Sequence, residues 1–152
     1  MLEEILTLLK LKNGKTVVDA TLGLGGHAIE IIKKISPKGR LIGIDRDKET
    51  LEIAKQKLGE YSSQCKFVND NFCNIDNILN SLKIKSVDGV ILDLGVSSPQ
   101  LDNPVRGFSF VNEGPLDMRM NRDSSISAFD LINNLSQQEI SAILWKFGQE
   151  RF

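Results

Sequence analysis

The sequence is poor in the residues from which disulfide frameworks and metal sites are built. Its 152 residues include two cysteines, Cys65 and Cys73, and a single histidine, His27. Two cysteines at this spacing match neither a disulfide framework nor a metal-binding motif, and His27 has no second histidine with which to bind a metal ion. The sequence therefore predicts reduced thiols, a cytoplasmic protein and no metal site.

A surplus of charge and long apolar runs are lacking as well. Nineteen Lys and Arg residues against twenty Asp and Glu residues give a net charge of −1, which provides no general attraction to nucleic acid or to an anionic membrane. Any RNA binding must therefore depend on particular residues. No apolar run reaches the roughly 18 residues of a membrane span, and the N-terminus lacks the basic-then-apolar pattern of a secretory signal.

What the sequence does contain is a glycine-rich turn between a predicted strand and a predicted helix. The segment TVVDATLGLGG, residues 16–26, begins as a β-branched apolar run typical of a buried strand. It then places three glycines within four positions, Gly23, Gly25 and Gly26. Such a turn brings backbone N–H groups and bare Cα atoms close to a cofactor. The following helix is indicated by an apolar stripe: Ala28, Ile31, Ile32 and Ile35.

Apolar segments typical of strands alternate with helical patterns as far as Leu94. After the glycine turn and its helix, strands are expected at residues 41–44, 65–68 and 87–94, and Asp47 is expected to cap the helix that follows the first of these. Because strands and helices of this length alternate, the sequence predicts right-handed βαβ crossovers and a parallel sheet. An amphipathic helix precedes the glycine turn and is expected to end at Asn13-Gly14.

The pattern changes after Leu101. Residues 102–123 contain scattered prolines and glycines and no sustained periodicity, so a long ordered loop is expected there. Two helices follow, the second beginning with a capping box made by Ser136 and Glu139, and residues 151–152 are expected to start a further helix. The second helix carries an apolar stripe: Ile140, Ile143, Leu144 and Phe147.

Two cofactors compete for the glycine turn. The segment from Gly23 to Ala28 fits G-x-G-x-x-A, and Asp45 ends the second strand where a ribose carboxylate is expected, as in NAD sites. S-adenosylmethionine sites share both features. Asp19, just before the turn, would repel a pyrophosphate but not an ammonium and a sulfonium, unless it only accepts N–H bonds from the turn. S-adenosylmethionine is therefore the predicted cofactor, and an NAD-dependent oxidoreductase is the alternative.

Asp93, at the end of the fourth predicted strand, is the predicted catalytic residue. It begins the segment DLGVSSPQ, which leaves the sheet beside the glycine turn. Methylation of an exocyclic amine requires acceptors that take its N–H bonds and turn the lone pair toward the methyl donor. A carboxylate does this and also stabilises the positive charge that develops on nitrogen. The alternative is that Asp93 caps the following turn.

Five segments of the sequence, taken together, resemble the RsmH (formerly MraW) family of methyltransferases. They are GLGGH, LIGIDRD, VDGVILDLGVSSPQLD, RGFSF and GPLDMRM, and the resemblance extends over essentially the whole chain. Members of this family methylate the N(4) amine of a cytidine in 16S rRNA with S-adenosylmethionine. The resemblance implies a Rossmann-like class I S-adenosylmethionine-dependent methyltransferase fold. It also implies small-subunit rRNA, or the assembling small ribosomal subunit, as the partner.

The resemblance also implies how the chain is divided. Residues 1–102 are expected to form the S-adenosylmethionine-binding part, whose parallel sheet is incomplete in this chain. Residues 103–152 are expected to form a loop and the start of an inserted helical domain for substrate recognition. Family members are longer, and this chain is expected to represent their N-terminal half.

Transferred residue by residue, the cofactor contacts of the family fall in the turn and at the ends of the later strands. Phe72 is expected to line the adenine site, whereas without the resemblance it would equally suit the edge of the core. The implied cofactor contacts are Gly25, Gly26, His27, Asp45, Phe72, Asp93 and Gln100.

Further residues after the fourth strand are candidates for handling RNA, because arginine clamps phosphate and phenylalanine stacks on an extruded base. The alternative is local ion pairing with the acidic residues between the arginines, and a loop held in place by the two phenylalanines. The candidates are Arg106, Phe108, Phe110, Arg119 and Arg122.

A chain that represents half of such an enzyme has predictable exposed surfaces. The fourth strand, with Val90, Ile91 and Leu92, would form a bare sheet edge, and the stripe of the last helix would meet water. We therefore expect self-association, for example a homodimer, or marginal stability, and no rRNA methylation by the chain alone. A non-enzymatic RNA-binding or ribosome-assembly protein on the same fold is the remaining alternative.

Overall fold

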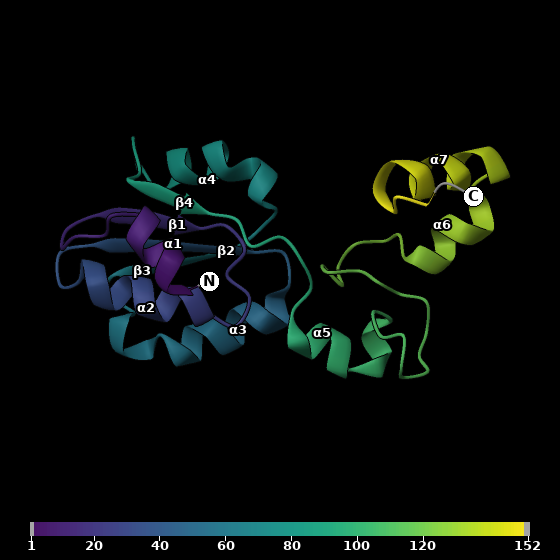
Figure 1. Cartoon of the computed structure of the whole chain (residues 1–152), viewed down its shortest axis with the longest axis horizontal. Helices are drawn as coiled ribbons and strands as arrows, with labels where there is room; N and C mark the ends of the chain where they lie inside the picture. Colours follow the sequence, from purple (N-terminus) through teal and green to yellow (C-terminus); the bar gives the residue numbers. More distant parts are fainter. Residues whose placement is uncertain (1, 151–152) are drawn as a thin grey trace. The chain divides into compact units, whose positions relative to one another are not determined.

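The computed structural model describes residues 2–150 and contains a four-stranded parallel sheet covered by helices (Figure 1). The strands are β1 (Thr16–Asp19), β2 (Arg40–Asp45), β3 (Cys65–Asn69) and β4 (Gly89–Ile91), in the spatial order β3-β2-β1-β4. Every neighbouring pair is parallel. The predicted parallel sheet with helical crossovers is confirmed.

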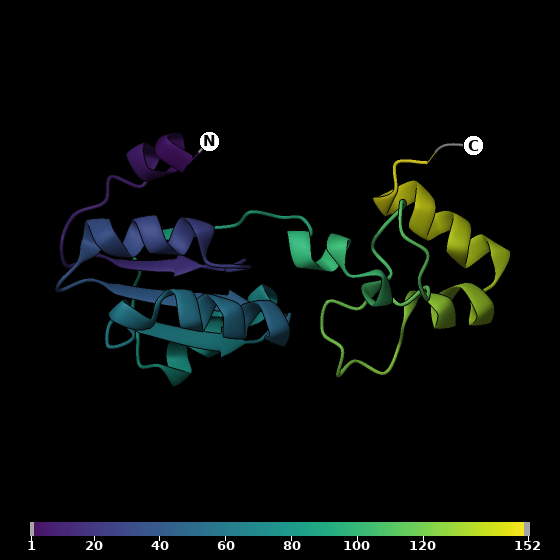
Figure 2. The same cartoon turned by 90° about the horizontal axis from the view of Figure 1, so that it is seen from below.

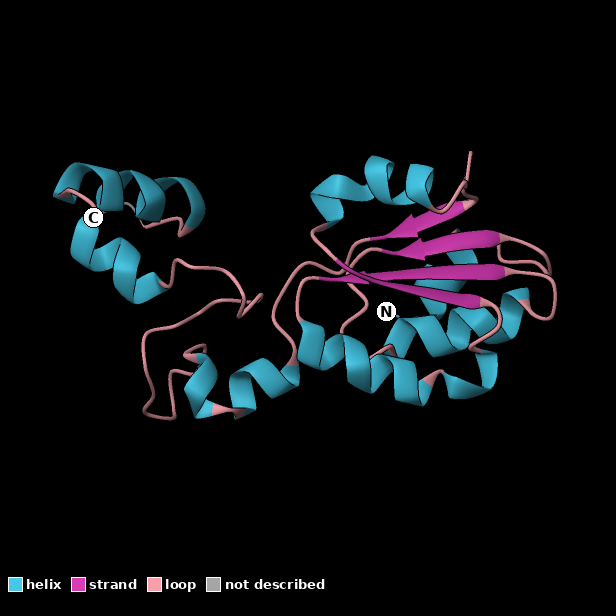
Figure 3. Ribbon diagram, turned by 180° about the vertical axis from the view of Figure 1, so that it is seen from behind, coloured by secondary structure: helices cyan, strands magenta, loops and turns pink. Residues whose placement is uncertain are grey.

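Helices cover both faces of this sheet (Figure 3). One face is covered by α1 (Leu2–Leu8), α2 (Gly26–Ile35) and α3 (Lys48–Lys57), and the other by α4 (Ile75–Ser81). Short 3₁₀ turns, η1 (Gly59–Tyr61) and η2 (Phe72–Asn74), flank β3. Asp47 caps α3 as predicted, because its side chain accepts a 3.0 Å bond from the Glu49 N–H. The first helix is shorter than expected and ends before Lys10, which has a positive φ of 47°.

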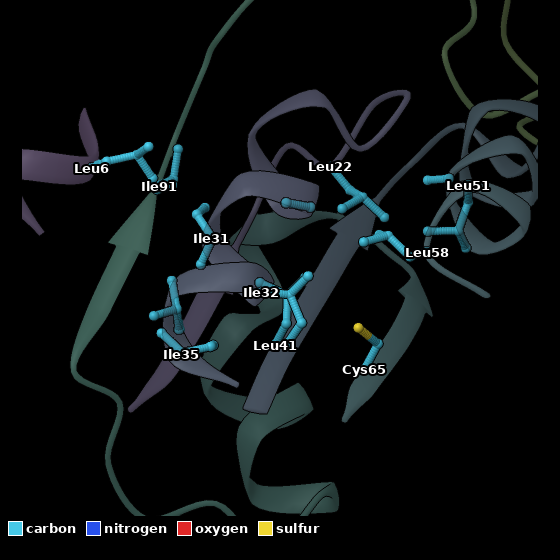
Figure 4. Close-up of a cluster of buried hydrophobic side chains, with 13 residues drawn as sticks. Leu6, Leu22, Ile31, Ile32, Ile35, Leu41, Leu51, Leu58, Cys65 and Ile91 are labelled. Carbon is cyan, nitrogen blue, oxygen red and sulfur yellow. The ribbon is translucent and has the colours of Figure 1, made fainter. Parts of the chain in front are cut away.

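The larger core cluster lies between the sheet and the first three helices (Figure 4). Its centre is the apolar stripe of α2 with Ile31, Ile32 and Ile35, packed against β1 and β2 and fully buried. The second cluster lies under α4, on the other face of the sheet. It contains the strand residues that alternate with those of the first cluster, such as Ile42 and Ile44. Each fully buried Ile or Leu side chain contributes about 1.5–3 kcal/mol, so both faces of the sheet are fixed by apolar burial.

The fourth strand differs from the prediction. Only Gly89–Ile91 pair with β1, instead of the eight residues expected. The reason is that β1 ends at Asp19 and turns away, so the ladder finishes with a 2.9 Å bond from the Ala20 N–H to the Ile91 carbonyl. Within the described residues β4 forms an edge of the sheet, as predicted, and Val90 and Leu92 are exposed.

The contacts divide the chain into two compact units, Met1–Ser97 and Ser98–Phe152. The second unit contains α5 (Ser98–Asp102), the 3₁₀ turn η3 (Pro104–Arg106), a long loop, α6 (Ala128–Asn134) and α7 (Gln137–Phe147) (Figure 2). The domain boundary expected at residue 102, with its recognition role for the second part, remains a prediction. Residues 151–152, where a further helix was expected, lie outside the described residues.

The helices of the second unit begin with side-chain caps. The predicted capping box of Ser136 and Glu139 at the start of α7 is confirmed. A second box, of Ser127 and Asp130, starts α6 and was not predicted. Three residues of the α7 stripe, Ile143, Leu144 and Phe147, are exposed as expected, whereas Ile140 is half-buried. Within residues 2–150, no helix combines the length and the apolar character that crossing a bilayer requires.

Candidate cofactor site

Three carboxylates lie at the carboxyl end of the sheet in the first unit. Asp19 is the last residue of β1, Asp45 is the last residue of β2, and Asp93 follows β4 by two positions. Because all the strands are parallel, these residues share one edge, which is where open α/β sheets bind ligands. The site is therefore built on the ends of rigid elements.

The glycine turn opens directly onto this edge. Gly23 and Gly25 have positive φ values of 52° and 73°, a conformation that costs other residues energy. The first N–H groups of α2 have no intrahelical carbonyl, and no side-chain cap satisfies them because the N-cap residue is Gly25. A Cβ added at Gly26 would meet no atom within 4 Å. Open space beside uncapped N–H groups suits the approach of a carboxylate or another polar ligand group.

Asp45 links the turn to the second strand. Its Oδ2 accepts the Gly23 N–H at 2.6 Å, and its Oδ1 accepts the Asp47 N–H at 2.8 Å. Burial raises the pKa of this carboxyl, and these N–H donors partly oppose the shift. Each oxygen retains a second lone pair, so the carboxylate can accept further hydrogen bonds, and its contact with a ribose remains a prediction.

Asp19 is almost completely buried and only partly satisfied. Its Oδ1 accepts the Thr21 N–H at 3.3 Å, whereas Oδ2 has no hydrogen-bond partner among the described residues. Burial raises the pKa of Asp19 to about 6, while the Thr21 N–H and nearby His27 act in the opposite direction. The bond from the turn fits the local alternative considered for Asp19. The unpaired oxygen fits a cationic ligand group, because an unsatisfied buried acceptor is costly.

Asp93 presents its carboxylate to solvent at the same edge. Its side chain is 55% exposed, and Oδ2 lies 3.8 Å from His27 Nδ1, longer than a hydrogen bond. Its N–H donates to Thr21 Oγ1 at 2.7 Å. None of the described contacts of Asp93 makes its carboxylate a cap of the next turn. The carboxylate of Asp93 is therefore largely open to solvent.

The loop after β3 completes the edge. Phe72 lies in η2 and is 37% exposed, so it is not a core residue. The Asp70 N–H bonds to the Asp45 carbonyl at 3.1 Å, and Asp70 Oδ1 accepts from the Asn71 N–H and the Asn74 amide. These bonds fix the loop to Asp45. This network was not predicted from the sequence, although Asn and Asp residues such as those between Asn69 and Asn74 are typical of such turns.

The structure brings together most, but not all, of the predicted cofactor residues. The turn residues, Asp45, Phe72 and Asp93 are all in the first unit. Gln100 is a buried residue of α5 in the second unit. The contact of each of these residues with the cofactor remains a prediction. Among the described residues no three His, Cys, Asp or Glu side chains form a group that could hold a metal ion.

Two of the arginines predicted to handle RNA are engaged within the second unit. Arg106 is buried, and its Nη2 donates to the carbonyls of Arg119 and Met120 at 3.1 and 3.2 Å. Arg119 forms a two-point ion pair with Asp117, at 2.9 Å from Nε and 2.7 Å from Nη2. Arg119 thus shows the ion pairing of the local alternative, whereas Arg106 binds main-chain carbonyls within the loop. Phe110 is fully exposed and remains a candidate for stacking.

Two of the segments that carry the family resemblance, RGFSF (residues 106–110) and GPLDMRM (residues 114–120), pack against one another. Gly107 has a φ of 72°, and a Cβ there would overlap the Pro115 carbonyl and lie 2.7 Å from the Asp117 nitrogen. The Met118 N–H donates to the Arg106 carbonyl at 3.0 Å. The spacing between the segments thus reflects a folded loop.

The fold and this site define a Rossmann-like protein of the class I methyltransferase type. A family model described as the MraW methylase family matches residues 1–152. The chain belongs to this family, whose members are S-adenosylmethionine-dependent methylases, which confirms the resemblance, the fold class and the cofactor expected from the sequence.

Similar proteins agree with this assignment. The chain is 51% identical to a protein of Halothermothrix orenii and 50% identical to one of Clostridium botulinum, both named ribosomal RNA small subunit methyltransferase H. The matches cover 100% of this chain and 49% of each relative, so the chain spans about half the length of these curated relatives. A crystal structure of a candidate rRNA-methylase from Clostridium thermocellum matches 63% of this chain and 52% of that chain, with a TM-score of 0.57 and 25% identity.

Proposed function

We propose that this chain forms the cofactor-binding part of an enzyme that methylates the N(4) amine of a cytidine in 16S rRNA with S-adenosylmethionine. The observation that carries the proposal is the pair of carboxylates at one sheet edge. Asp19 is buried with an unpaired oxygen, and Asp93 is exposed beside the glycine turn. The names of the similar proteins support rRNA of the small subunit as substrate.

The residues of the site fit the parts of this cofactor. The N–H groups at the start of α2 suit its carboxylate, the unpaired oxygen of Asp19 suits its ammonium group, and Asp45 suits its ribose hydroxyls. Phe72, half-exposed in η2, suits its adenine. When bound, S-adenosylmethionine supplies an electrophilic methyl group on a sulfonium.

Asp93 orients the substrate amine. Its carboxylate accepts N–H bonds from the amine and thereby turns the nitrogen lone pair toward the methyl group. The negative charge also stabilises the positive charge that develops on nitrogen.

We assign rRNA recognition to the second unit, acting on rRNA or on the assembling small subunit in the cytoplasm. Exposed aromatic side chains such as Phe110 and Trp145 suit stacking on unpaired bases. Free cysteines, Cys65 and Cys73, agree with a reducing compartment.

A homodimer would cover the exposed residues of the α7 stripe. Sedimentation of the purified chain tests for this dimer. A monomer at micromolar concentration would contradict the proposed homodimer.

Titration of the purified chain with S-adenosylmethionine and with NAD tests the cofactor. We expect saturable binding in the titration with S-adenosylmethionine and no binding in the titration with NAD. The reverse result, binding of NAD but not of S-adenosylmethionine, would favour the oxidoreductase alternative. Asp45→Ala removes acceptors for the ribose and should weaken binding by about 1–3 kcal/mol. Asp76→Ala, which removes an exposed carboxylate on α4, is the matched control and should bind normally.

A chimera tests methyl transfer, with this chain followed by the remaining half of the Halothermothrix orenii relative. We expect mass analysis of small-subunit rRNA nucleosides to detect N(4)-methylcytidine after incubation with the cofactor. Asp93→Asn keeps the shape but loses the charge, so turnover should fall on the order of 100-fold while RNA binding persists. RNA binding with no methylated nucleoside in the unmutated chimera would favour the non-enzymatic alternative.

A further inference from the structure

One threonine connects the two carboxylates of the site. The Thr21 N–H donates to Asp19 Oδ1 at 3.3 Å, and Thr21 Oγ1 accepts the Asp93 N–H at 2.7 Å. The residue that contacts the buried carboxylate thus also holds the main chain that carries the exposed one.

The contact between Thr21 and Asp93 lies just beyond the point where the backbone hydrogen bonds between β1 and β4 end. The last backbone bond between β1 and β4 runs from the Ala20 N–H to the Ile91 carbonyl. Beyond it the backbone of the first strand enters the glycine turn, so parallel pairing cannot continue to Asp93. The Thr21 hydroxyl replaces the missing backbone acceptor with a side chain.

The opposite end of β4 is also fixed to β1. The Asp88 N–H donates to the Thr16 carbonyl at 2.7 Å, and Asp88 Oδ2 accepts the Thr16 N–H at 2.8 Å. A short strand that is held at both ends cannot slide along its neighbour. The position of Asp93 relative to the turn therefore depends on Thr21 at one end and on Asp88 at the other.

We infer that Thr21 is a positioning residue that holds Asp93 in register with the cofactor turn, an inference that rests on the proposed function. Thr21 acts through Asp93 and not on the reacting atoms. Its hydroxyl is the required feature, because valine has the same shape but leaves the Asp93 N–H without its acceptor. Serine retains the hydroxyl, although its side chain is less restricted.

Amide hydrogen exchange in the purified chain tests the contact directly. Thr21→Val should accelerate exchange at the Asp93 amide on the order of tenfold, and Thr21→Ser should keep it within about threefold of the original rate. The Asp88 amide, at the other end of β4, is the internal control. Thr7→Val is the control variant, because it removes a hydroxyl that bonds to the Glu3 carbonyl in α1 and should change neither amide.

Kinetics of the chimera separate positioning from a merely structural role. Thr21→Val should lower kcat on the order of 10- to 100-fold, with the KM for S-adenosylmethionine within about threefold, and Thr21→Ser should restore most of kcat. If Thr21→Val does not fold, Thr21→Ala against Thr21→Ser makes the same comparison. Unchanged Asp93 exchange or unchanged kcat without the hydroxyl overturns the inference. An unmutated chimera that transfers no methyl group overturns the proposed function instead, and the exchange rates still decide whether Thr21 holds Asp93.

Discussion

In the first unit the buried side chains are mainly apolar, whereas in the second unit they are polar. Among the described residues, every buried apolar side chain lies between Leu6 and Ile91, and the buried side chains of the second unit are Gln100 and Arg106. The first unit is thus stabilised by apolar area removed from water. The second is organised by capping boxes, an ion pair and a buried guanidinium, which give local order and little apolar burial.

The two units also differ in how they shift the pKa of an aspartate. Burial raises the pKa of Asp19, in the first unit, to about 6. The hydrogen bonds and charge of Arg119 lower the pKa of Asp117, in the second unit, to about 2. The carboxylate of the ligand site is therefore destabilised when charged, and the carboxylate of the loop is stabilised when charged. A buried carboxyl whose pKa is raised by desolvation is typical of functional sites.

Removing apolar volume should affect the first unit most. Ile32→Ala creates a cavity in the centre of the larger core cluster and should lower the free energy of unfolding by about 2–5 kcal/mol. Ile143→Ala, the same change on the exposed stripe of α7, should change it by less than about 1 kcal/mol. Urea unfolding followed by far-ultraviolet circular dichroism measures both. Equal losses would contradict the contrast between the units.

Asp19 should make the first unit less stable as the pH rises. Its folded pKa of about 6 exceeds the ordinary value of 3.8, so the folded state binds the proton more tightly. Its contribution is fully present below about pH 4 and is lost as the pH rises through 6. A shift of about two pKa units, at about 1.4 kcal/mol per unit, corresponds to about 3 kcal/mol.

Comparison of Asp19→Asn with the unmutated chain isolates this effect. The two proteins should have similar free energies of unfolding at pH 4, and the variant should be the more stable one at pH 7.5. Asp76→Asn, at an exposed position, controls for the general loss of a charge. A difference between Asp19→Asn and the unmutated chain that stays constant from pH 4 to 7.5 would show that Asp19 keeps an ordinary pKa.

The sequence predicted the first unit well because apolar periodicity determines its structure. The α2 stripe and the strands at residues 41–44 and 65–68 are found where the pattern placed them. The predicted length of β4 was wrong because the apolar pattern of residues 87–94 does not reveal where the neighbouring strand turns away. That limit is set by the glycine turn, which is far from β4 in the sequence.

The site could be predicted only in part. Single residues such as Asp45 follow from their place at the end of a strand. The bond between Thr21 and Asp93 joins residues 72 positions apart, and no local pattern indicates it. In the second unit the arginines could be read either as RNA contacts or as ion-pair partners. Only the folded loop shows that Arg106 and Arg119 bind main-chain carbonyls and Asp117.

The smallest loss of stability is expected when Arg106, in the second unit, is replaced. Arg106→Met retains an unbranched apolar stem but leaves the carbonyls of Arg119 and Met120 without this donor. The loss of stability should be about 1–3 kcal/mol and should be confined to the loop. Faster exchange of the Met118 amide, which donates to the Arg106 carbonyl, and faster proteolysis between residues 107 and 126 are the expected signs.

Two further variants decide what the Arg106 guanidinium does. Arg106→Lys keeps the charge without the planar fork, so it should loosen the loop almost as much as methionine if the bonds to the carbonyls matter. Arg40→Met, on an exposed position of β2, should leave the loop unchanged. A loop that stays protected in Arg106→Met while the chimera loses affinity for rRNA would return Arg106 to the RNA contacts predicted from the sequence. Loss of loop protection together with retained affinity would make it a purely internal support.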